Sequence, residues 1–227
     1  MRNWKWYQWL GVTLVTLVAL VLIFNGPLSR WLAGSQRVQV EKPRVERSLK
    51  NYDYGAIGRL NAAQVAKGRL AKHHFIGVIA MPALQLTVPI SQGVTTDTLA
   101  VGAGTMRPNM AMGKGNYALA GHNMDDDKTL FSPLEHRAKP GQTIYISDMH
   151  RVYVYKVTTV KGISAKAINT VANTHAPLVT LITCNASGSA RVMVRGHLTK
   201  MMSFKHASPA VQKLLVKNVT NRPPVKV

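Results

Sequence analysis

The sequence predicts an all-β domain, a barrel or a sandwich, that follows an N-terminal transmembrane helix. No charged residue occurs from Trp6 to Ser29, whereas from Phe75 onward brief β-rich runs alternate with turn residues. No internal repeat of about 20–50 residues is present, which excludes solenoids and propellers. Hydrophobic residues make up 46% of the 227 residues, as in an ordinary globular domain with room for an added segment.

The charge-free segment has the length of a membrane-spanning helix. As a helix it would extend about 36 Å, more than the roughly 30 Å of a bilayer's hydrocarbon core. Aromatic rings, which favour membrane interfaces, lie at both ends, at Trp4, Trp6, Tyr7, Trp9 and Trp31. A cleavable signal peptide is the alternative, but the segment is long for one, and the nearest candidate site, Leu32–Ser35, lacks a clear A-x-A pattern. We therefore expect residues 1–28 to be a retained anchor.

Charge alone does not orient this anchor. Arg2 and Lys5 precede it, while more basic residues follow, namely Arg30, Arg37, Lys42, Arg44, Arg47 and Lys50. The positive-inside rule would thus place the large part of the chain in the cytoplasm, yet long domains translocate largely regardless of charge. The orientation therefore depends on the chemistry of the domain.

Changes in composition along the sequence divide the chain into four segments. After the anchor, residues 29–68 form a polar stalk with a short helix near Asn61–Ala71, residues 69–203 form the β-rich domain, and 204–227 are a basic tail. The predicted strands are Phe75–Ala80, Leu84–Ile90, Tyr117–Ala120, Thr143–Ile146, Val152–Val160, Leu178–Cys184 and Arg191–Leu198. We expect a hairpin turn at Asp148–His150 and short helical turns at Leu130–Leu134 and Ala165–Val171.

The chain is strongly basic, with 29 Lys and Arg against 9 Asp and Glu, a net charge of +20. The basic residues are spread along the chain, and no nucleic-acid-binding signature with interleaved aromatics occurs. We therefore expect no nucleic acid as partner, but attraction to anionic lipid headgroups or wall polymers. A single cysteine also excludes an intrachain disulfide or a multi-cysteine metal site.

That cysteine, Cys184, ends an apolar strand, and the residues near it in sequence are of kinds that can activate a thiol. A lone cysteine is ordinarily a small buried hydrophobe. Here the turn-prone residues 185–190 connect it to Arg191, so a hairpin would place thiol and guanidinium at the same end of the sheet, where the cation would stabilise a thiolate or an oxyanion. His122 likewise follows the apolar run Tyr117–Ala120. If these strand ends meet, cysteine, histidine and arginine form a constellation for acyl transfer.

The motifs around these residues resemble those of sortases, most closely class A, the housekeeping type. Thr180–Cys184 matches the T-L-x-T-C signature, Arg191 matches the catalytic arginine, and Ala118–His122 matches the histidine segment. Further matches are Gly102–Met106, Asn116–Ala118 and Leu130–Leu134. The resemblance covers roughly residues 70–200.

The resemblance implies a closed β-barrel of about eight strands on the outer face of a Gram-positive plasma membrane. It implies cleavage of an LPxTG-like signal of surface proteins between Thr and Gly, and transfer of the acyl group to an amine of lipid II or the peptidoglycan cross-bridge. Cys184 would be the nucleophile, His122 the general acid/base and Arg191 the oxyanion and substrate clamp, with Thr183 assisting the oxyanion site. Substrate-groove residues would be Ala103, Thr105, Ala118 and Ile182.

No cofactor or metal site is expected. Some class A sortases bind calcium through clustered carboxylates, but the segment Ile163–Asn173 carries none, and Asp125–Asp127 lacks EF-hand spacing. We therefore expect no calcium requirement.

Other functions are open. No S-x-x-K or G-x-S-x-G motif occurs, which excludes the corresponding serine acyltransferases and hydrolases. A pilus-type sortase and a non-catalytic, membrane-anchored β-domain that binds anionic wall polymers remain as alternatives.

Overall fold

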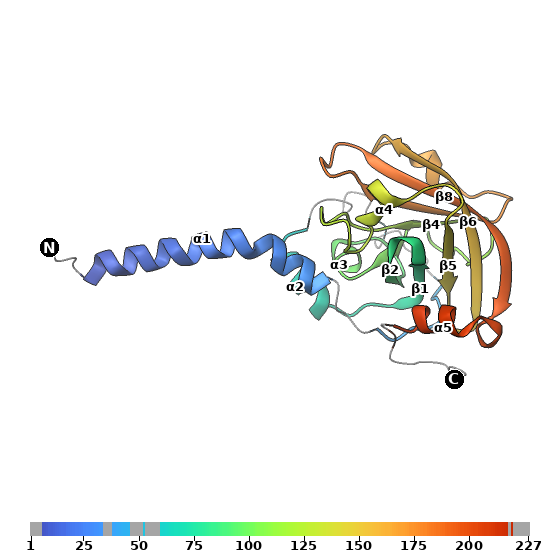
Figure 1. Ribbon diagram of the computed structural model, residues 1–227, viewed down its shortest axis with the longest axis horizontal. Helices are drawn as coiled ribbons and strands as arrows, with labels where there is room; N and C mark the ends of the chain where they lie inside the picture. The colour runs from blue at the N-terminus through green and yellow to red at the C-terminus, as the bar shows by residue number, and fades with distance from the viewer. Residues whose placement is uncertain (1–5, 34–37, 46–51, 53–59, 218, 220–227) are drawn as a thin grey trace.

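A computed structural model describes residues 6–33, 38–45, 52, 60–217 and 219, and shows a long helix joined to a β-barrel (Figure 1). The helix, α1 (Trp6–Ala33), extends away from the barrel. Within the described part of the chain it is the one helix long and apolar enough to cross a membrane, and its most apolar stretch is not buried at all. Its last turns do contact the rest of the protein, because Ser29 is buried and Leu32 packs against the barrel's core.

The short helix predicted near Asn61 is present as α2 (Ala62–Leu70) and packs beside α1. A capping box explains its start, since the Asn61 side chain accepts from the Gln64 amide at 2.9 Å and the Gln64 side chain accepts from the Asn61 amide at 2.9 Å. The Asn25 side chain of α1 accepts a hydrogen bond from the Ala62 amide at 2.8 Å. Helix α1 is thus tied to α2 through a specific contact.

Eight strands close into a barrel, which confirms the predicted fold class. In the order β1-β2-β3-β4-β7-β8-β6-β5, most neighbours are antiparallel, while β2 with β3 and β4 with β7 run parallel. The strands are β1 (Phe75–Met81), β2 (Leu86–Ser91), β3 (Ala103–Thr105), β4 (Asn116–Ala120), β5 (Thr143–Ser147), β6 (Arg151–Ile163), β7 (Leu178–Cys184) and β8 (Arg191–Ser203).

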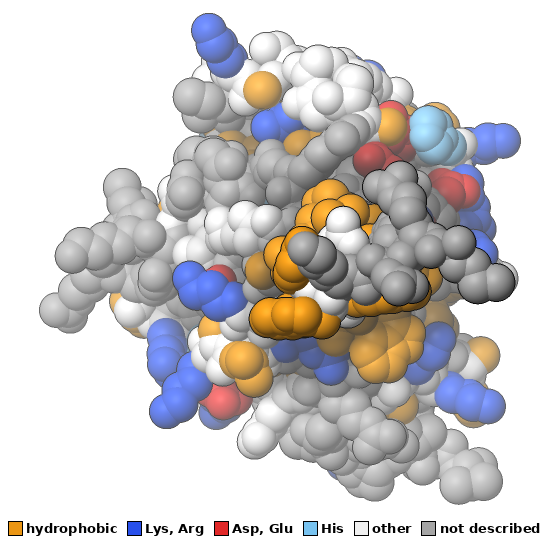
Figure 2. All heavy atoms as spheres, turned by 90° about the vertical axis from the view of Figure 1, so that its left-hand side faces the viewer, with side chains coloured by type: hydrophobic (Ala, Val, Ile, Leu, Met, Phe, Trp, Pro, Cys, Tyr) orange, Lys and Arg blue, Asp and Glu red, His pale blue; other side chains and the backbone are white. Residues whose placement is uncertain are grey.

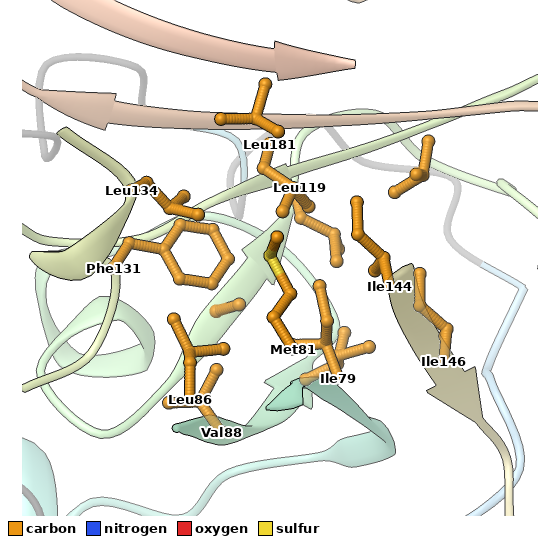
Figure 3. Close-up of a cluster of buried hydrophobic side chains, with 14 of the residues drawn as sticks. Ile79, Met81, Leu86, Val88, Leu119, Phe131, Leu134, Ile144, Ile146 and Leu181 are labelled. Atoms are coloured by element: carbon orange, nitrogen blue, oxygen red, sulfur yellow. The ribbon is translucent and has the colours of Figure 1, made fainter. Parts of the chain in front are cut away.

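Short helices connect or flank the strands. They are η2 (Pro82–Leu84), α3 (Thr96–Leu99), α4 (Pro133–Arg137), η3 (Ile168–Val171), η4 (Phe204–His206) and α5 (Pro209–Leu215). Among these, α4 is anchored in the barrel's core. The side chains of Phe131, just before the helix, and Leu134, within it, point into that core (Figure 3).

The barrel interior is filled by alternate residues of the strands. Leu119 of β4 and Leu181 of β7 lie in it with Ile79, Met81 and Ile144, and their side chains point toward one another (Figure 3). Burying one such side chain contributes about 1.5–3 kcal/mol, so this cluster is a main source of stability. The next residues along β4 and β7 face the outer side of the wall and form a separate cluster.

All the predicted strands are present, and most of their ends are shifted by a few residues. The strand β3 was not predicted. The hairpin at Asp148–His150 is also present, since the Asp148 carboxylate accepts from the amides of His150 at 2.9 Å and Arg151 at 2.7 Å. The turn expected at Leu130–Leu134 is the helix α4, which begins at Pro133.

The segments outside the barrel pack on it more than their composition indicated. Helix α1 continues to Ala33, and Val38 and Val40 are buried, with bridges to Val219 and Phe75. In the region expected to be a basic tail, Phe204, Leu215 and Val216 are buried in one hydrophobic cluster together with Val38 and Val40. This cluster is separate from the one formed by β4 and β7.

Candidate active site

The parallel pairing of β4 with β7 brings His122 to the level of Cys184. Ala120 pairs with Ile182, and His122 and Cys184 each follow two residues later. Hydrogen bonds flank the histidine on both sides: the Gly121 amide donates to the Ile182 carbonyl at 3.0 Å, and the Asn123 side-chain amide donates to the Cys184 carbonyl at 3.0 Å. His122 is therefore held alongside the end of β7.

The hairpin between β7 and β8 brings Arg191 to Cys184. The two residues are paired in register at the loop end of the hairpin. The connecting loop is closed by the Asn185 amide, which donates to the Ala190 carbonyl at 3.1 Å, and by Gly188, whose positive φ of 75° suits glycine. The structure thus brings together the strand ends that carry His122, Cys184 and Arg191.

These residues border an apolar cluster on the outer face of the barrel wall. The buried members around Cys184 are Val94, Leu99, Met106, Ala118, Ala120, Val171, Ile182 and Met193. His122 is fully buried and Cys184 is 5% exposed, while Arg191 is half-buried. A thiol, an imidazole and a guanidinium at the edge of a buried apolar cluster are the functional groups that acyl transfer by a cysteine nucleophile requires.

A row of polar side chains crosses the same outer face next to the apolar cluster. The Arg195 guanidinium donates through Nε to the Thr180 hydroxyl at 3.1 Å, and that hydroxyl donates to the Asn116 side-chain oxygen at 2.8 Å. Arg195 also donates to the Thr170 carbonyl at 2.7 Å, and the Asn116 side chain donates to the carbonyls of Thr170 at 3.1 Å and Ala172 at 3.0 Å. This row holds η3 against the barrel, which positions Val171 in the cluster around Cys184.

The loop after His122 is folded back on itself. The Phe131 amide donates to the His122 carbonyl at 3.0 Å, and the Met124 amide donates to the Ser132 hydroxyl at 2.7 Å. Burial alone would raise the pKa of Asp126, but hydrogen bonds from the Thr129 hydroxyl and from the amides of Thr129 and Lys128 outweigh it and hold this pKa below its usual value. The loop is therefore fixed by a carboxylate that favours its ionised form.

Helix α1 reaches this loop as well. Arg30, in the last turns of α1, donates through Nε to the Met124 carbonyl at 3.2 Å. Figure 2 views the molecule from the side on which α1 protrudes and shows Lys and Arg side chains at several places toward the rim of this face, with a few Asp and Glu among them. Cationic side chains in such a position suit an anionic membrane surface.

The predicted groove residues lie in different environments. Ala118 and Ile182 belong to the cluster around Cys184, whereas Ala103 packs in the barrel interior. Thr105 is buried and its hydroxyl accepts from the Gly93 amide at 2.8 Å. Thr183 is fully buried beside Cys184, and among the residues that the structure describes its hydroxyl has no hydrogen-bond partner.

Several residues at the site were not identified from the sequence: Asn116, Asn123, Glu135 and Arg195. A signal existed for Asn116, because a polar residue opens an otherwise apolar strand. Glu135 is one of few acids in a basic chain, but its partners are distant in sequence. Within the described ranges, no group of three or more His, Cys, Asp or Glu side chains is placed to hold a metal ion.

Comparison with known proteins agrees with this geometry. Residues 79–199 match the family model of the sortase domain. The chain is similar to sortase A of Streptococcus agalactiae, with 31% identity over 92% of each chain, and to sortase A of Bacillus anthracis, with 36% identity over 81% of this chain and 93% of the relative. The solved structure of Listeria monocytogenes sortase A superposes with a TM-score of 0.58 at 34% identity, covering 63% of this chain and 97% of that one. The chain belongs to the sortase family.

Proposed function

We propose that the chain is a class A-type sortase, a cysteine transpeptidase that cleaves an LPxTG-like sorting signal between Thr and Gly and joins the released carboxyl end of a surface protein to a cell-wall amine. The observation that carries this proposal is the register of β4, β7 and β8. It brings the ends carrying His122, Cys184 and Arg191 together beside a buried apolar cluster, in a chain that matches the sortase domain.

In the proposed reaction the Cys184 sulfur attacks the Thr carbonyl carbon of the signal, and the thiol proton passes to His122. Arg191 donates hydrogen bonds to the oxyanion that forms on the carbonyl oxygen. The intermediate collapses by breaking the Thr–Gly C–N bond, while His122 returns its proton to the leaving amine. Cys184 then holds the acyl group as a thioester, and Thr183 offers a further hydrogen-bond donor beside it.

The second half of the reaction runs the same chemistry in reverse. An amine of lipid II or of the peptidoglycan cross-bridge attacks the thioester, His122 takes its proton, and the Cys184 thiolate leaves. The apolar cluster that contains Ala118 and Ile182 receives the Leu and Pro of the signal. Neither half requires a cofactor or a metal.

The apolar helix α1 anchors the protein in the plasma membrane as a single span, with the barrel on the extracytoplasmic side. Its length and exposure support the anchor, and the contact from Arg30 to Met124 supports a fixed orientation. This arrangement keeps the site close to the membrane, where lipid-linked acceptors and unprocessed surface proteins both reside.

Replacing the nucleophile separates this function from that of a non-catalytic β-domain. The full-length protein in detergent micelles, with and without Cys184→Ala, is incubated with a fluorogenic LPxTG peptide and a short amine, and peptide binding is followed by fluorescence anisotropy. We expect the variant to lose turnover and to bind the peptide as the parent protein does. Binding of anionic wall polymer by both proteins, with turnover by neither, would instead support the non-catalytic β-domain.

A further inference from the structure

A single carboxylate, that of Glu135, links the residue after His122 to the chain just after Cys184. Glu135 of α4 accepts from the Asn123 side-chain amide through Oε2 at 2.5 Å, and from the Ala186 amide through Oε1 at 3.0 Å. The same Asn123 nitrogen donates to the Cys184 carbonyl at 3.0 Å. We call these three contacts the Glu135–Asn123 bridge.

Both the side-chain nitrogen and the side-chain oxygen of Asn123 are hydrogen-bonded. Its nitrogen donates both protons, to Glu135 and to the Cys184 carbonyl, and its side-chain oxygen accepts from the Asp125 amide at 2.9 Å. Asn123 is also buried, so each of these bonds is costly to lose. An amide is the functional group that donates twice and accepts once in this arrangement.

The position of Glu135 is set by the barrel core. Phe131 and Leu134 are fully buried in the interior cluster (Figure 3), and α4 therefore presents its next residue toward the end of β7. The Glu135 side chain is only 14% exposed. A rigid, core-anchored helix thus holds the carboxylate in place.

Electrostatic pairing does not explain this glutamate. Among the described residues its ion-pair contact is with His136, at 3.8 Å, and that side chain is 66% exposed. The close partners are neutral N–H groups of Asn123 and Ala186. In a chain of net charge +20, a largely covered carboxylate that binds amides rather than cations favours a positioning role.

We propose that Glu135 and Asn123 are positioning residues for the transpeptidation, an inference that rests on the proposed function. The bridge holds the strand end that carries His122 against the one that carries Cys184, and it fixes the first turn of the loop that leads to Arg191. A displacement of about 1 Å between reacting groups costs roughly a hundredfold in rate, so the bridge acts on kcat through the geometry of these groups.

The test uses the full-length protein in micelles and the variants Glu135→Gln, Glu135→Ala and Asn123→Ala. Glutamine keeps the size of the side chain but replaces one acceptor oxygen with a donor, so that one N–H group of the bridge faces another. We expect kcat to fall about 10- to 100-fold in each variant, with KM for the peptide within about threefold. The double variant Asn123→Ala/Glu135→Ala should lose little more than either single one, because both belong to one bridge.

Asp148→Ala is the matched control. Asp148 likewise accepts two N–H hydrogen bonds, both from backbone amides, but in the β5–β6 hairpin at the end of the barrel away from Arg191. It should lose thermal stability to an extent similar to Glu135→Ala while keeping kcat. Glu135→Gln at the parent kcat, a loss confined to KM, or full additivity in the double variant would each overturn the inference.

A second readout does not depend on turnover. At high pH, where the thiol is ionised, we expect iodoacetamide to alkylate Cys184 several-fold faster in Glu135→Gln than in the parent, because the strand end that carries the buried thiol is held less firmly. We expect equal rates in the parent and Asp148→Ala. Equal rates in all three would contradict the bridge's effect on Cys184. A parent protein without turnover, in contrast, would count against the proposed function and leave the alkylation comparison valid.

Discussion

Cys184 and Arg191 are register partners, the last residue of β7 and the first of β8, so the hairpin itself sets the separation of thiol and guanidinium. The antiparallel pairing continues without a shift from this pair to Leu178 and His197. Because the hairpin is part of the closed barrel, changes in the loop at 185–190 have little freedom to move the two residues apart. This explains how an exposed loop can connect two groups that need fixed geometry.

Arg191→Lys tests whether the guanidinium fork is needed at this position. Lysine keeps the charge but lacks the planar, bidentate donor group, and removing an oxyanion donor typically costs about 100- to 1,000-fold in kcat. We expect a loss of that order in steady-state turnover of the fluorogenic peptide. Arg151→Lys, at the exposed far end of β6, is the control and should keep the parent rate. Parent-like turnover by Arg191→Lys would show that charge alone suffices.

Gly121→Ala should damage both the fold and the site. A Cβ at this position would lie 2.5 Å from Cδ2 and 2.6 Å from Cγ of the fully buried Phe131 ring. Overpacking of this kind costs about 1–3 kcal/mol, and relief of the clash would shift the adjacent His122. Thermal unfolding and turnover measure both effects. Gly162→Ala, where nothing lies within 4 Å, is the control, and an equally active Gly121→Ala would contradict the packing described.

Arg195→Ala should weaken substrate binding more than chemistry. The substitution removes the donors that hold the Thr170 carbonyl and the Thr180 hydroxyl, and thereby frees the segment that carries Val171. Since Val171 packs in the cluster around Cys184, we expect KM to rise about 5- to 20-fold, which corresponds to roughly 1–2 kcal/mol, with kcat changed by less than about threefold. A fall in kcat alone would mean that Arg195 acts on the reacting groups instead.

The depressed pKa of Asp126 predicts a pH-dependent contribution to stability. Its ordinary value is near 3.8 and its folded value lies lower, so the carboxylate stabilises the fold above pH 3.8, and that stabilisation is lost as the pH falls through the folded pKa. The difference in unfolding temperature between the parent and Asp126→Asn should therefore shrink as the pH is lowered from about 6 to about 3. A constant difference across this range would mean that Asp126 has no such role.

Calcium should have no effect on turnover. The segment Ile163–Asn173 has no carboxylate, and it is instead held to the barrel by the side chains of Arg195, Asn116 and Arg107, the last through Nε to the Val171 carbonyl at 2.7 Å. Rates measured with EDTA and with added calcium should agree, with magnesium as the control for ionic strength. A large, saturable rise specific to calcium would contradict this prediction.

The barrel was predictable to the extent that its strands are marked in the local sequence. The apolar run Leu178–Cys184 is β7 with both ends correct, because flanking turn residues bound it on each side. β3 was missed since its three residues, Ala103–Thr105, are too short to show a period. Pro133, a residue favoured in the first turn of helices, marks the start of α4 better than the apolar residues before it.

The candidate site was predictable only where its residues belong to local sequence patterns. His122, Cys184 and Arg191 each stand at a strand end, and the family motifs name them. The residues that hold them do not form a local pattern: Asn123 contacts Cys184 across 61 positions, and Glu135 contacts Ala186 across 51. Burial of Phe204 and Leu215 in the expected tail is likewise a long-range result, because their apolar partners include Val38 and Val40 near the other end of the chain.

The formation of an acyl-enzyme on Cys184 decides whether this protein is a sortase in activity as well as in family. The full-length protein in micelles is mixed with an LPxTG-type peptide, quenched with acid and examined by peptide mass spectrometry, with and without a short amine. We expect a thioester on the Cys184 peptide that disappears, with transpeptidation product, when the amine is present, and no adduct in Cys184→Ala. No adduct with any of several signal variants, in a protein that binds them, would contradict the proposed function.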